Sequence, residues 1–162
     1  MREPVNLPQG LSFDMGDKRW MKKSWRITKY KKGDESVSNT TLQNDDHLHF
    51  TIQNGEIWEV RYVIFTAAIG ALGTAPGIFL QVNAPTSTGK WGIVSEDSGD
   101  HELLNRSVSV LGHASTFPIL DISALVIGGA NETVNLQWCQ AAASATATTV
   151  KTHSYMVAER MV

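Results

Sequence analysis

The feature that most restricts the fold is a two-residue alternation of apolar and polar side chains in short runs. Over positions 47–52, Leu48, Phe50 and Ile52 alternate with polar residues, which is the pattern of a strand with one buried face. The chain shows no comparable helical period, and turn-forming residues, including 13 glycines and five prolines, separate the runs. These patterns favour an all-β fold.

An Asn-Gly pair at positions 54–55 follows this run, and it is the strongest short-range signal for a hairpin. We therefore expect the next run, residues 57–66, to be the antiparallel partner of the first. Its apolar side chains begin on one face at Trp58 and reach both faces between Tyr62 and Phe65. A strand that is apolar on both faces in a small sandwich is expected to meet a partner subunit or a covering loop.

Other runs have similar strand character and are bounded by turn residues. They cover positions 25–30, 77–85, 90–94, 107–112, 117–128, 134–142, 148–151 and 154–161. One helical turn is expected at 102–104, inside an acidic loop. Together the runs predict eight to ten short strands in an antiparallel sandwich or barrel.

Length and composition suit a single domain with its own core, since the chain has 162 residues of which 42% are hydrophobic and 19% charged. The single cysteine, Cys139, excludes an intrachain disulfide. No apolar segment follows the first charges, so we expect no signal peptide. Glycines and Pro76 interrupt the most apolar stretch, residues 65–80, before it reaches the roughly 20 residues of a membrane span.

Charge divides the chain unequally. Residues 1–32 contain nine Lys or Arg and three Asp or Glu, whereas residues 33–162 contain five and 13. We interpret residues 1–32 as a basic N-terminal arm with the first strand, and residues 33–162 as an acidic β-sandwich body. Such an arm suits an acidic protein surface better than nucleic acid, because the body would repel a polyanion. The residues expected to bind this partner are Lys18, Arg19, Trp20, Lys22, Lys23, Trp25 and Arg26.

No motif for nucleophilic catalysis, phosphate binding or dinucleotide binding occurs in the sequence. The segment Asp45 to His49 has a spacing that can bind metal, but we interpret it as a turn followed by solvent-facing polar residues. The acidic run 96–102 lacks the spacing of a calcium loop. Asp121 is expected to be a hydrogen-bonded structural residue, and Cys139 a packed thiol. We therefore predict no catalytic, cofactor or metal site.

Two segments of the body resemble a group of small tailed-bacteriophage virion proteins. They are "KGDESVSNTTLQNDDHLHFTIQNGEIWEVRYVI" near the start of the body and "LQWCQAAASATATTVKTHSYMVAERM" at its end. The matching positions are Asp34, Glu35, Ser36, Thr41, Leu42, Gln43, Leu136, Gln137, Trp138, Gln140, Thr149, Val150, Ser154, Tyr155 and Arg160. The resemblance covers about 60 of the 162 residues and excludes the basic arm.

The resemblance implies an antiparallel jelly-roll-like β-sandwich with an extended N-terminal arm, trimeric and exposed on the phage particle. Leu136 and Trp138 would fill the core. The expected trimer interface consists of Tyr62, Ile64, Phe65, Gln137 and Gln140. A closed trimer would cover the two-sided apolar end of residues 62–65.

These observations predict a non-enzymatic virion protein, assembled in the host cytoplasm, that binds the major capsid protein or neighbouring virion proteins on the capsid surface. Its role would be that of a decoration, or cement, protein that bridges capsomers and stabilises the shell. The alternative is a tail-fibre or tail-tip module that contacts the host surface. A third class, a small carbohydrate-active enzyme using Asp121, predicts turnover that we do not expect.

Overall fold

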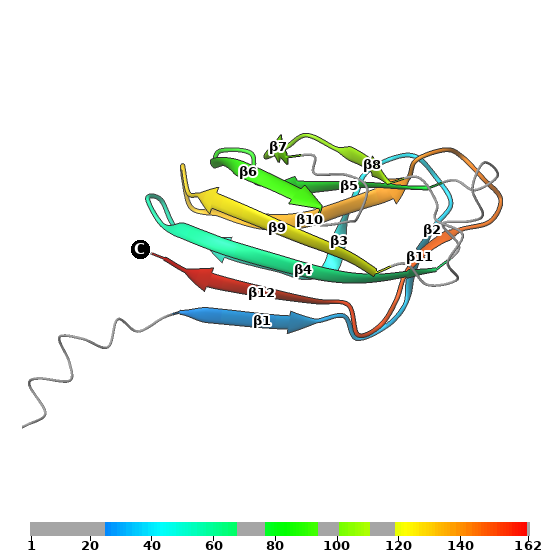
Figure 1. Ribbon diagram of the computed structural model, residues 1–162, viewed down its shortest axis with the longest axis horizontal. Coiled ribbons are helices and arrows are strands. Elements are labelled where there is room, and N and C mark those ends of the chain that lie inside the picture. The colour runs from blue at the N-terminus through cyan, green and yellow to red at the C-terminus, as the bar shows by residue number, and fades with distance from the viewer. Residues whose placement is uncertain (1–24, 68–76, 94–100, 111–118, 162) are drawn as a thin grey trace, which may run out of the picture.

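The computed structural model describes residues 25–67, 77–93, 101–110 and 119–161. Every regular element in these ranges is a β-strand, and the strands form two main antiparallel layers (Figure 1). The expectation of an all-β antiparallel sandwich is confirmed. Twelve strands occur where eight to ten were predicted, because two- and three-residue pairings add short strands between the long ones.

The larger sheet is a continuous path of six strands. Its order is β1 (Arg26–Tyr30), β12 (Tyr155–Arg160), β4 (Ile57–Ala67), β9 (Ile119–Ile127), β6 (Thr88–Ile93) and β7 (His101–Leu103). The short strand β11 (Thr148–Val150) also pairs with β4, and β2 (Glu35–Val37) pairs with β11. The helical turn expected at 102–104 is wrong, because residues 101–103 pair with β6 as a strand.

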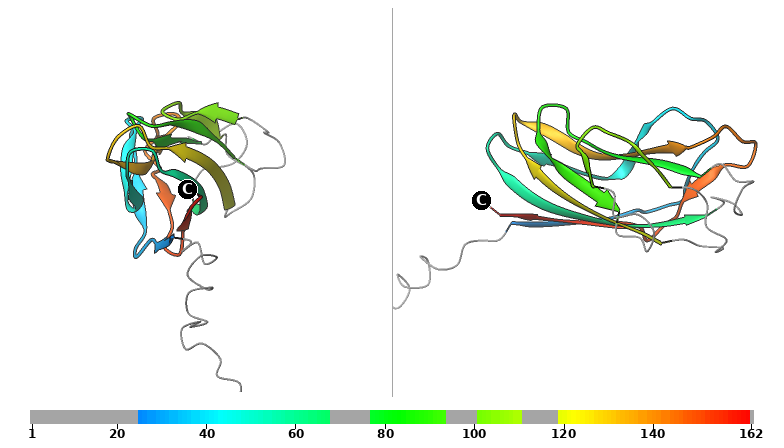
Figure 2. Two further views of the ribbon diagram at one scale, coloured as in Figure 1. Left: turned by 90° about the vertical axis from the view of Figure 1, so that its left-hand side faces the viewer. Right: turned by 45° about the horizontal axis from the view of Figure 1, so that its top comes forward.

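The smaller sheet has four strands in the order β3 (Gln43–Ile52), β10 (Glu132–Gln140), β5 (Ile78–Asn83) and β8 (Val108–Val110). The right-hand view of Figure 2 shows this layer above β4 and β12. Strands β5, β9, β10 and β12 lie within or overlap the runs predicted from sequence. In these strands the two-residue alternation matches the buried side chains.

The main strand pairs are nested along the chain. The first long strand pairs with the last, β1 with β12; inside them β3 pairs with β10, β4 with β9, and β5 with β8. All four pairs are antiparallel. The chain thus resembles one long hairpin that has been rolled so that alternate pairs lie in opposite sheets.

The Asn-Gly turn has a different role from the one expected. Gly55 adopts a φ of 79°, and the Glu56 N–H donates to the Gln53 carbonyl at 3.2 Å, so a tight turn does form. It joins strands of opposite sheets, however, because β3 pairs with β10 while β4 pairs with β9 and β12. The predicted β3–β4 hairpin is wrong. Both strands bury their apolar faces against each other, and the Phe50 and Trp58 rings lie 5.1 Å apart between the layers.

The core fills the space between the two sheets. Its largest fully buried side chains come from both layers and are Trp91, Trp138, Tyr62, Leu48, Ile52, Ile64, Ile78, Leu80, Ile122, Leu136 and Met156. The prediction that Leu136 and Trp138 fill the core is confirmed. No helix in the described part of the chain has the length and apolar character to cross a membrane.

Strand β3 begins earlier than predicted and contains a bulge. Asn135 pairs with His49, whereas Gln137, two residues on, pairs with Asn44, five residues back. The additional residues of β3 interrupt the ladder and change which side chains face inward. As a result Asp45 is buried, and the prediction of a solvent-facing turn at this position is wrong.

Candidate functional site

The residues predicted to bind a partner through the arm divide into two groups. Lys18, Arg19, Trp20, Lys22 and Lys23 lie outside the described residues. Trp25 is exposed directly before β1, and Arg26 is exposed on β1, where its Nε lies 3.5 Å from Glu159 Oε1. Strand β1 is therefore part of the body, paired with β12 over five positions.

The structure does not bring the predicted trimer-interface residues together. Tyr62 and Ile64 are fully buried between the sheets of this one chain. Gln140 is also fully buried, where its side chain donates to the Thr146 carbonyl at 2.6 Å and accepts from the Ser144 N–H at 3.1 Å. These three side chains offer no surface to another subunit, so this part of the prediction is corrected.

The other two predicted interface residues are partly exposed and belong to different sheets. Phe65 is on the outward parity of β4 in the larger sheet, opposite Ile119 of β9. Gln137 is on β10 of the smaller sheet, where its amide donates to Asn44 Oδ1 at 2.8 Å. They therefore do not form one continuous surface on this chain.

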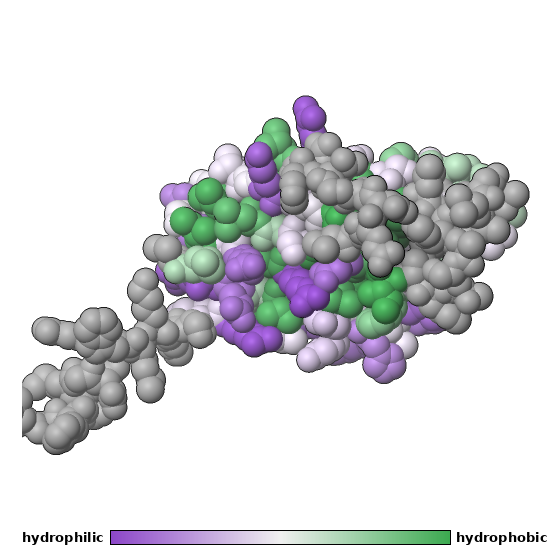
Figure 3. Space-filling model, in the orientation of Figure 1, coloured by the Kyte–Doolittle hydropathy of each residue, from purple (hydrophilic) through white to green (hydrophobic). Residues whose placement is uncertain are grey.

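The outer face of the larger sheet carries apolar side chains that the sequence prediction missed. Ile119, Leu125 and Ile127 of β9 are 59%, 45% and 39% exposed, and Leu103 of β7 is 52% exposed. Leu125, Lys90 and Leu103 are successive partners across β9, β6 and β7. We call Leu103, Leu125 and Ile127 the β9–β7 apolar patch. Figure 3 shows hydrophobic surface on both sides of a hydrophilic zone on this side of the molecule.

The charged middle of the same face lines two shallow grooves. One, of about 260 Å³, includes Glu59, Lys90 and Leu125; the other, of about 330 Å³, includes Glu59, Arg26 and Tyr155. Arg61 donates from Nε and Nη2 to Asp121 at 2.9 and 2.5 Å. These hydrogen bonds raise the pKa of the Arg61 guanidinium. Asp121 is thus an ion-pair partner, as expected for a structural role.

The predicted histidine pair lines a third groove, between β1 and β3. His47 and His49 share this groove of about 420 Å³ with Lys29, Lys32 and Asp46. Among the residues that the structure describes, no three His, Cys, Asp or Glu side chains are grouped closely enough to hold a metal ion. The neighbouring lysines make the groove cationic, which is unfavourable for a divalent metal.

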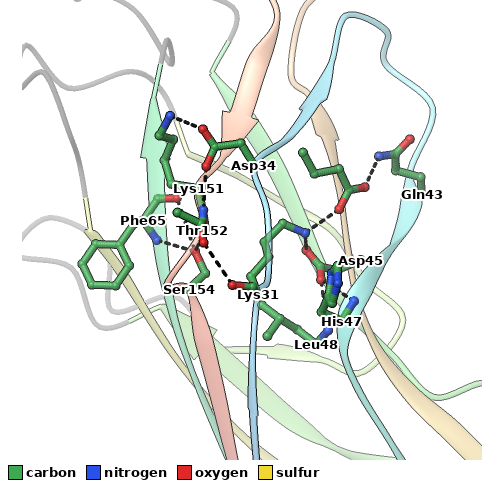
Figure 4. A network of polar contacts seen from close by, with 11 residues as sticks. Lys31, Asp34, Gln43, Asp45, His47, Leu48, Phe65, Lys151, Thr152 and Ser154 are labelled. Carbon is green, nitrogen blue, oxygen red and sulfur yellow. Dashed lines mark hydrogen bonds and ion pairs between the residues drawn. The ribbon is translucent and has the colours of Figure 1, made fainter.

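The most enclosed polar cluster lies where the edges of the two sheets meet. Lys31 follows β1 of the larger sheet, and its Nζ donates to Glu35 Oε2 at 2.5 Å and to Asp45 Oδ2 at 2.6 Å (Figure 4). The side chains of Lys31 and Asp45 are both 0% exposed, and that of Glu35 is 17% exposed. Burial of a charge is tolerated only when it is paired and hydrogen-bonded in this way. We call these three residues the Lys31 cluster.

Hydrogen bonds from the bulge hold the carboxylate of Asp45. Its Oδ1 accepts the backbone N–H groups of His47 and Leu48 at 2.9 and 3.0 Å. Glu35 is held in turn by Gln43, whose Nε2 donates to Oε1 at 2.7 Å. The N–H groups that the interrupted ladder leaves unpaired are thus satisfied by the side chain that the bulge turns inward.

A second, exposed part of this network lies at the β11–β12 turn. Asp34 is paired with Lys151 and accepts the Thr152 N–H at 2.7 Å. The pairing with Lys151 and the Thr152 hydrogen bond lower the pKa of Asp34. Ser154 also binds this turn, since its hydroxyl donates to the Lys151 carbonyl at 2.8 Å and accepts the Phe65 N–H at 3.0 Å (Figure 4).

Three buried polar atoms have no hydrogen-bond partner among the described residues: His47 Nδ1, the Tyr62 hydroxyl and Trp138 Nε1. Burial, together with the charge of Asp45, raises the pKa of Tyr62. Burial likewise raises the pKa of the Cys139 thiol, which disfavours the thiolate needed for a nucleophile. Tyr62, Trp138 and Cys139 are packed in the core and are not arranged for proton transfer to a ligand.

Sequence patterns contained a signal for some of the missed residues. Ile27, Lys29 and Lys31 are at alternate positions and lie on the inward face of β1 and its continuation. The burial of Lys31 could therefore have been predicted from the alternation. Strand β9 has apolar residues on both of its faces, as the end of β4 does, and this pattern was visible in the sequence. Asp45 had no such signal, because extending the alternation of Leu48 and Phe50 backwards points Asp46 inward.

Comparisons of this chain with protein-family models, with curated proteins and with solved structures found no match.

Proposed function

We propose that this protein is a non-enzymatic structural component of a tailed-phage particle, a trimeric decoration protein on the capsid surface. The observation that carries this proposal is a sandwich whose outer sheet face presents apolar side chains, namely Ile119 and the β9–β7 apolar patch. Exposed apolar groups on a folded domain are typical of protein contact surfaces. The resemblance of the first and last parts of the body to phage virion proteins gives the proposal its biological setting.

The nested order of strand pairs supports a jelly roll. Numbering the eight nested strands in chain order, the pairs are first with eighth, second with seventh, third with sixth and fourth with fifth. This is the order of a hairpin rolled into two Greek keys, an arrangement used by viral capsid domains among others. Strands β6 and β7 would then extend the larger sheet beyond that core.

The contact between copies is assigned to the β9–β7 apolar patch in place of Tyr62, Ile64 and Gln140. Glu59 and Lys90 flank Leu125 on the neighbouring strands, and Lys90 lies between Leu125 and Leu103, so charged and apolar side chains alternate across this face. Subunit contacts commonly mix apolar and polar groups in this way. Trp25 and Arg26 are exposed at the β1 edge of the larger sheet, opposite β7, and we assign them to the contact with the capsid.

The location on the particle is tested by electron microscopy of the source virions with gold-labelled antibody against this protein. The proposal expects gold over the heads. Gold on tails supports the alternative of a tail-fibre or tail-tip module. Gold on no particle overturns the virion assignment.

The trimer is tested by light scattering of the purified chain, for which we expect a mass three times the 17.8 kDa of one chain. Leu125→Glu places a charge at the centre of the β9–β7 apolar patch and is expected to give monomers. Thr51→Glu, on an exposed position of β3 in the other sheet, is the matched control and should leave the mass unchanged. A monomeric parent protein contradicts the proposed contact.

The arm is tested with shells that lack the protein. Removing residues 1–24 deletes five of the seven predicted partner-binding residues and leaves every described strand intact. We expect the shortened protein to fold but to bind shells more weakly. Equal binding of the shortened and full-length proteins contradicts a role for the arm.

The tail-module alternative would use the 330 Å³ groove around Tyr155. The groove is lined by the aromatic ring of Tyr155 and by charged side chains, including Arg26, Glu59 and Glu159. Groups of these kinds can bind sugars. Binding to host cells that is lost in Tyr155→Ala, together with gold on tails, favours this alternative over decoration.

A further inference from the structure

The Lys31 cluster holds the parts of an amide-forming reaction. We propose that Lys31 and Asp45 condense spontaneously after folding, so that the mature chain contains an isopeptide bond between Lys31 Nζ and Asp45 Cγ. The proposal concerns the folded chain alone and does not depend on the function proposed above.

The amine of Lys31 and the carboxyl group of Asp45 are held together where water does not reach them. Lys31 Nζ lies 2.6 Å from Asp45 Oδ2, and both side chains are 0% exposed. A lysine amine is a nucleophile once it loses a proton. Fixed proximity of this kind replaces a bimolecular encounter, and it can lower the activation free energy substantially.

The carbonyl oxygen of the reacting carboxyl group is held by two donors. Asp45 Oδ1 accepts the His47 and Leu48 N–H groups at 2.9 and 3.0 Å. Attack at Cγ moves negative charge onto this oxygen, and two fixed N–H donors stabilise such an oxyanion. The bulge in β3 therefore places an oxyanion hole at the atom that needs one.

Glu35 is placed to move protons between the two reacting groups. Its Oε2 lies 2.5 Å from Lys31 Nζ, and Gln43 holds its other oxygen at 2.7 Å. A positioned carboxylate at hydrogen-bond distance is a general base for the amine and a general acid for the leaving oxygen. Figure 4 shows the Lys31 side chain directed toward Asp45.

The reaction balances within the cluster. The Lys31 ammonium transfers one proton to Asp45 Oδ2, which leaves a neutral amine beside a carboxylic acid. The amine attacks Asp45 Cγ and forms the C–N bond; Glu35 then removes a second proton from nitrogen and delivers it to the Oδ2 hydroxyl. The C–Oδ2 bond breaks, water leaves, and Glu35 returns to its starting charge. No oxidant or cofactor is required.

A nearby ion pair provides an internal contrast. Lys151 and Asp34 are also in contact, but their side chains are 34% and 41% exposed. Water stabilises both of their charges and competes for the acyl carbon, so we expect this pair to remain an ion pair. Burial and the two N–H donors distinguish the Lys31 cluster.

The test is the intact mass of the full-length purified protein under denaturing conditions. We expect the parent chain to be lighter than its calculated mass by one water molecule, and digestion to yield a peptide joined through Lys31 and Asp45. Lys31→Ala should have its calculated mass. Lys151→Ala, the matched control in the exposed pair, should keep the deficit.

Two conservative variants keep the test informative if Lys31→Ala does not fold. Glu35→Gln keeps the size of the side chain and one acceptor oxygen for Lys31 but cannot relay protons, so the water deficit should disappear or form at least 10-fold more slowly. Asp45→Asn offers an amide to the same amine, so its deficit should be one ammonia molecule. A parent chain of full calculated mass overturns the proposal, as does a water deficit that persists in Lys31→Ala.

Discussion

Two lysine–carboxylate contacts at the same end of the molecule differ in what surrounds them. The Lys31 cluster is enclosed at the meeting edges of the two sheets, whereas Asp34 and Lys151 are in contact at the exposed β11–β12 turn. Both connect the segment after β1 to distant parts of the chain. The difference teaches that burial, more than the charges themselves, determines how strongly the fold depends on a pair.

Asp45→Ala is expected to have the largest effect on stability. It removes one partner from a buried cluster, so Lys31 loses its anion, or in the condensed chain the proposed amide bond, and the His47 and Leu48 N–H groups lose their acceptor. Breaking a buried pair on one side costs about 3–5 kcal/mol. Urea unfolding followed by tryptophan fluorescence measures this loss. Exposed ion pairs contribute at most about 1 kcal/mol. A smaller loss than this in Asp45→Ala would show that the cluster stabilises the fold no more than a surface ion pair does.

Replacing both partners together is expected to cost less. In Lys31→Met with Asp45→Asn the two fully buried charges are gone, Glu35 keeps its hydrogen bond from Gln43, and the Asn oxygen still accepts the two N–H groups. We expect this double variant to lose about 1–2 kcal/mol, because the uncompensated buried charge is the costly element. The two single variants complete a double-mutant cycle when it is measured on protein whose intact mass shows no loss of water or ammonia, because the proposed cross-link would add its own stability to the parent and to Asp45→Asn. Additive losses would show that the two charges do not depend on each other.

Asp34→Asn tests the exposed pair and should have a smaller effect than either change in the cluster. The pKa of Asp34 is lowered in the fold by Lys151 and the Thr152 N–H, so its contribution is present above the unfolded pKa of the carboxyl group. That contribution is lost as the pH falls through the lower, folded pKa. The parent and variant should therefore differ in stability at pH 7 and converge near pH 2. A difference that grows at low pH has the wrong sign for this pair.

Salt should have the smallest effect and should separate the two pairs. Raising the salt concentration to about 1 M shortens the screening length to about 3 Å. We expect salt to reduce the stability difference between the parent and Asp34→Asn and to leave that of Asp45→Ala nearly unchanged. Thermal unfolding at low and high salt provides the measurement. Equal salt sensitivity would mean that solvent reaches the Lys31 cluster.

Prediction from sequence succeeded where a strand keeps a simple alternation. The inward residues Leu48, Phe50 and Ile52 of β3, and Leu136 and Trp138 of β10, are all buried. The turn at Gly55 also formed where expected. Such features depend on neighbours along the chain, which periodicity and turn chemistry describe.

Errors occurred where a decision depended on residues far away in sequence. The turn at 53–56 is local, but whether β3 pairs with β4 depends on β9, β10 and β12, which provide more hydrogen-bonded partners. Tyr62 looked available for an interface because the smaller sheet that covers it cannot be placed from sequence. Asp45 looked exposed because the bulge that turns it inward has no local signature.

The sequence by itself determined the all-β class, the approximate positions of the long strands, the core role of Trp138 and the charge difference between the N-terminal part and the body. These properties follow from composition, alternation and turn residues, which act over a few positions. The tertiary structure alone decided the nested pairing, the burial of the Lys31 cluster and the exposed β9–β7 apolar patch. Strand pairing joins positions as distant as Arg26 and Glu159, and only the completed sandwich decides which side chains water can reach.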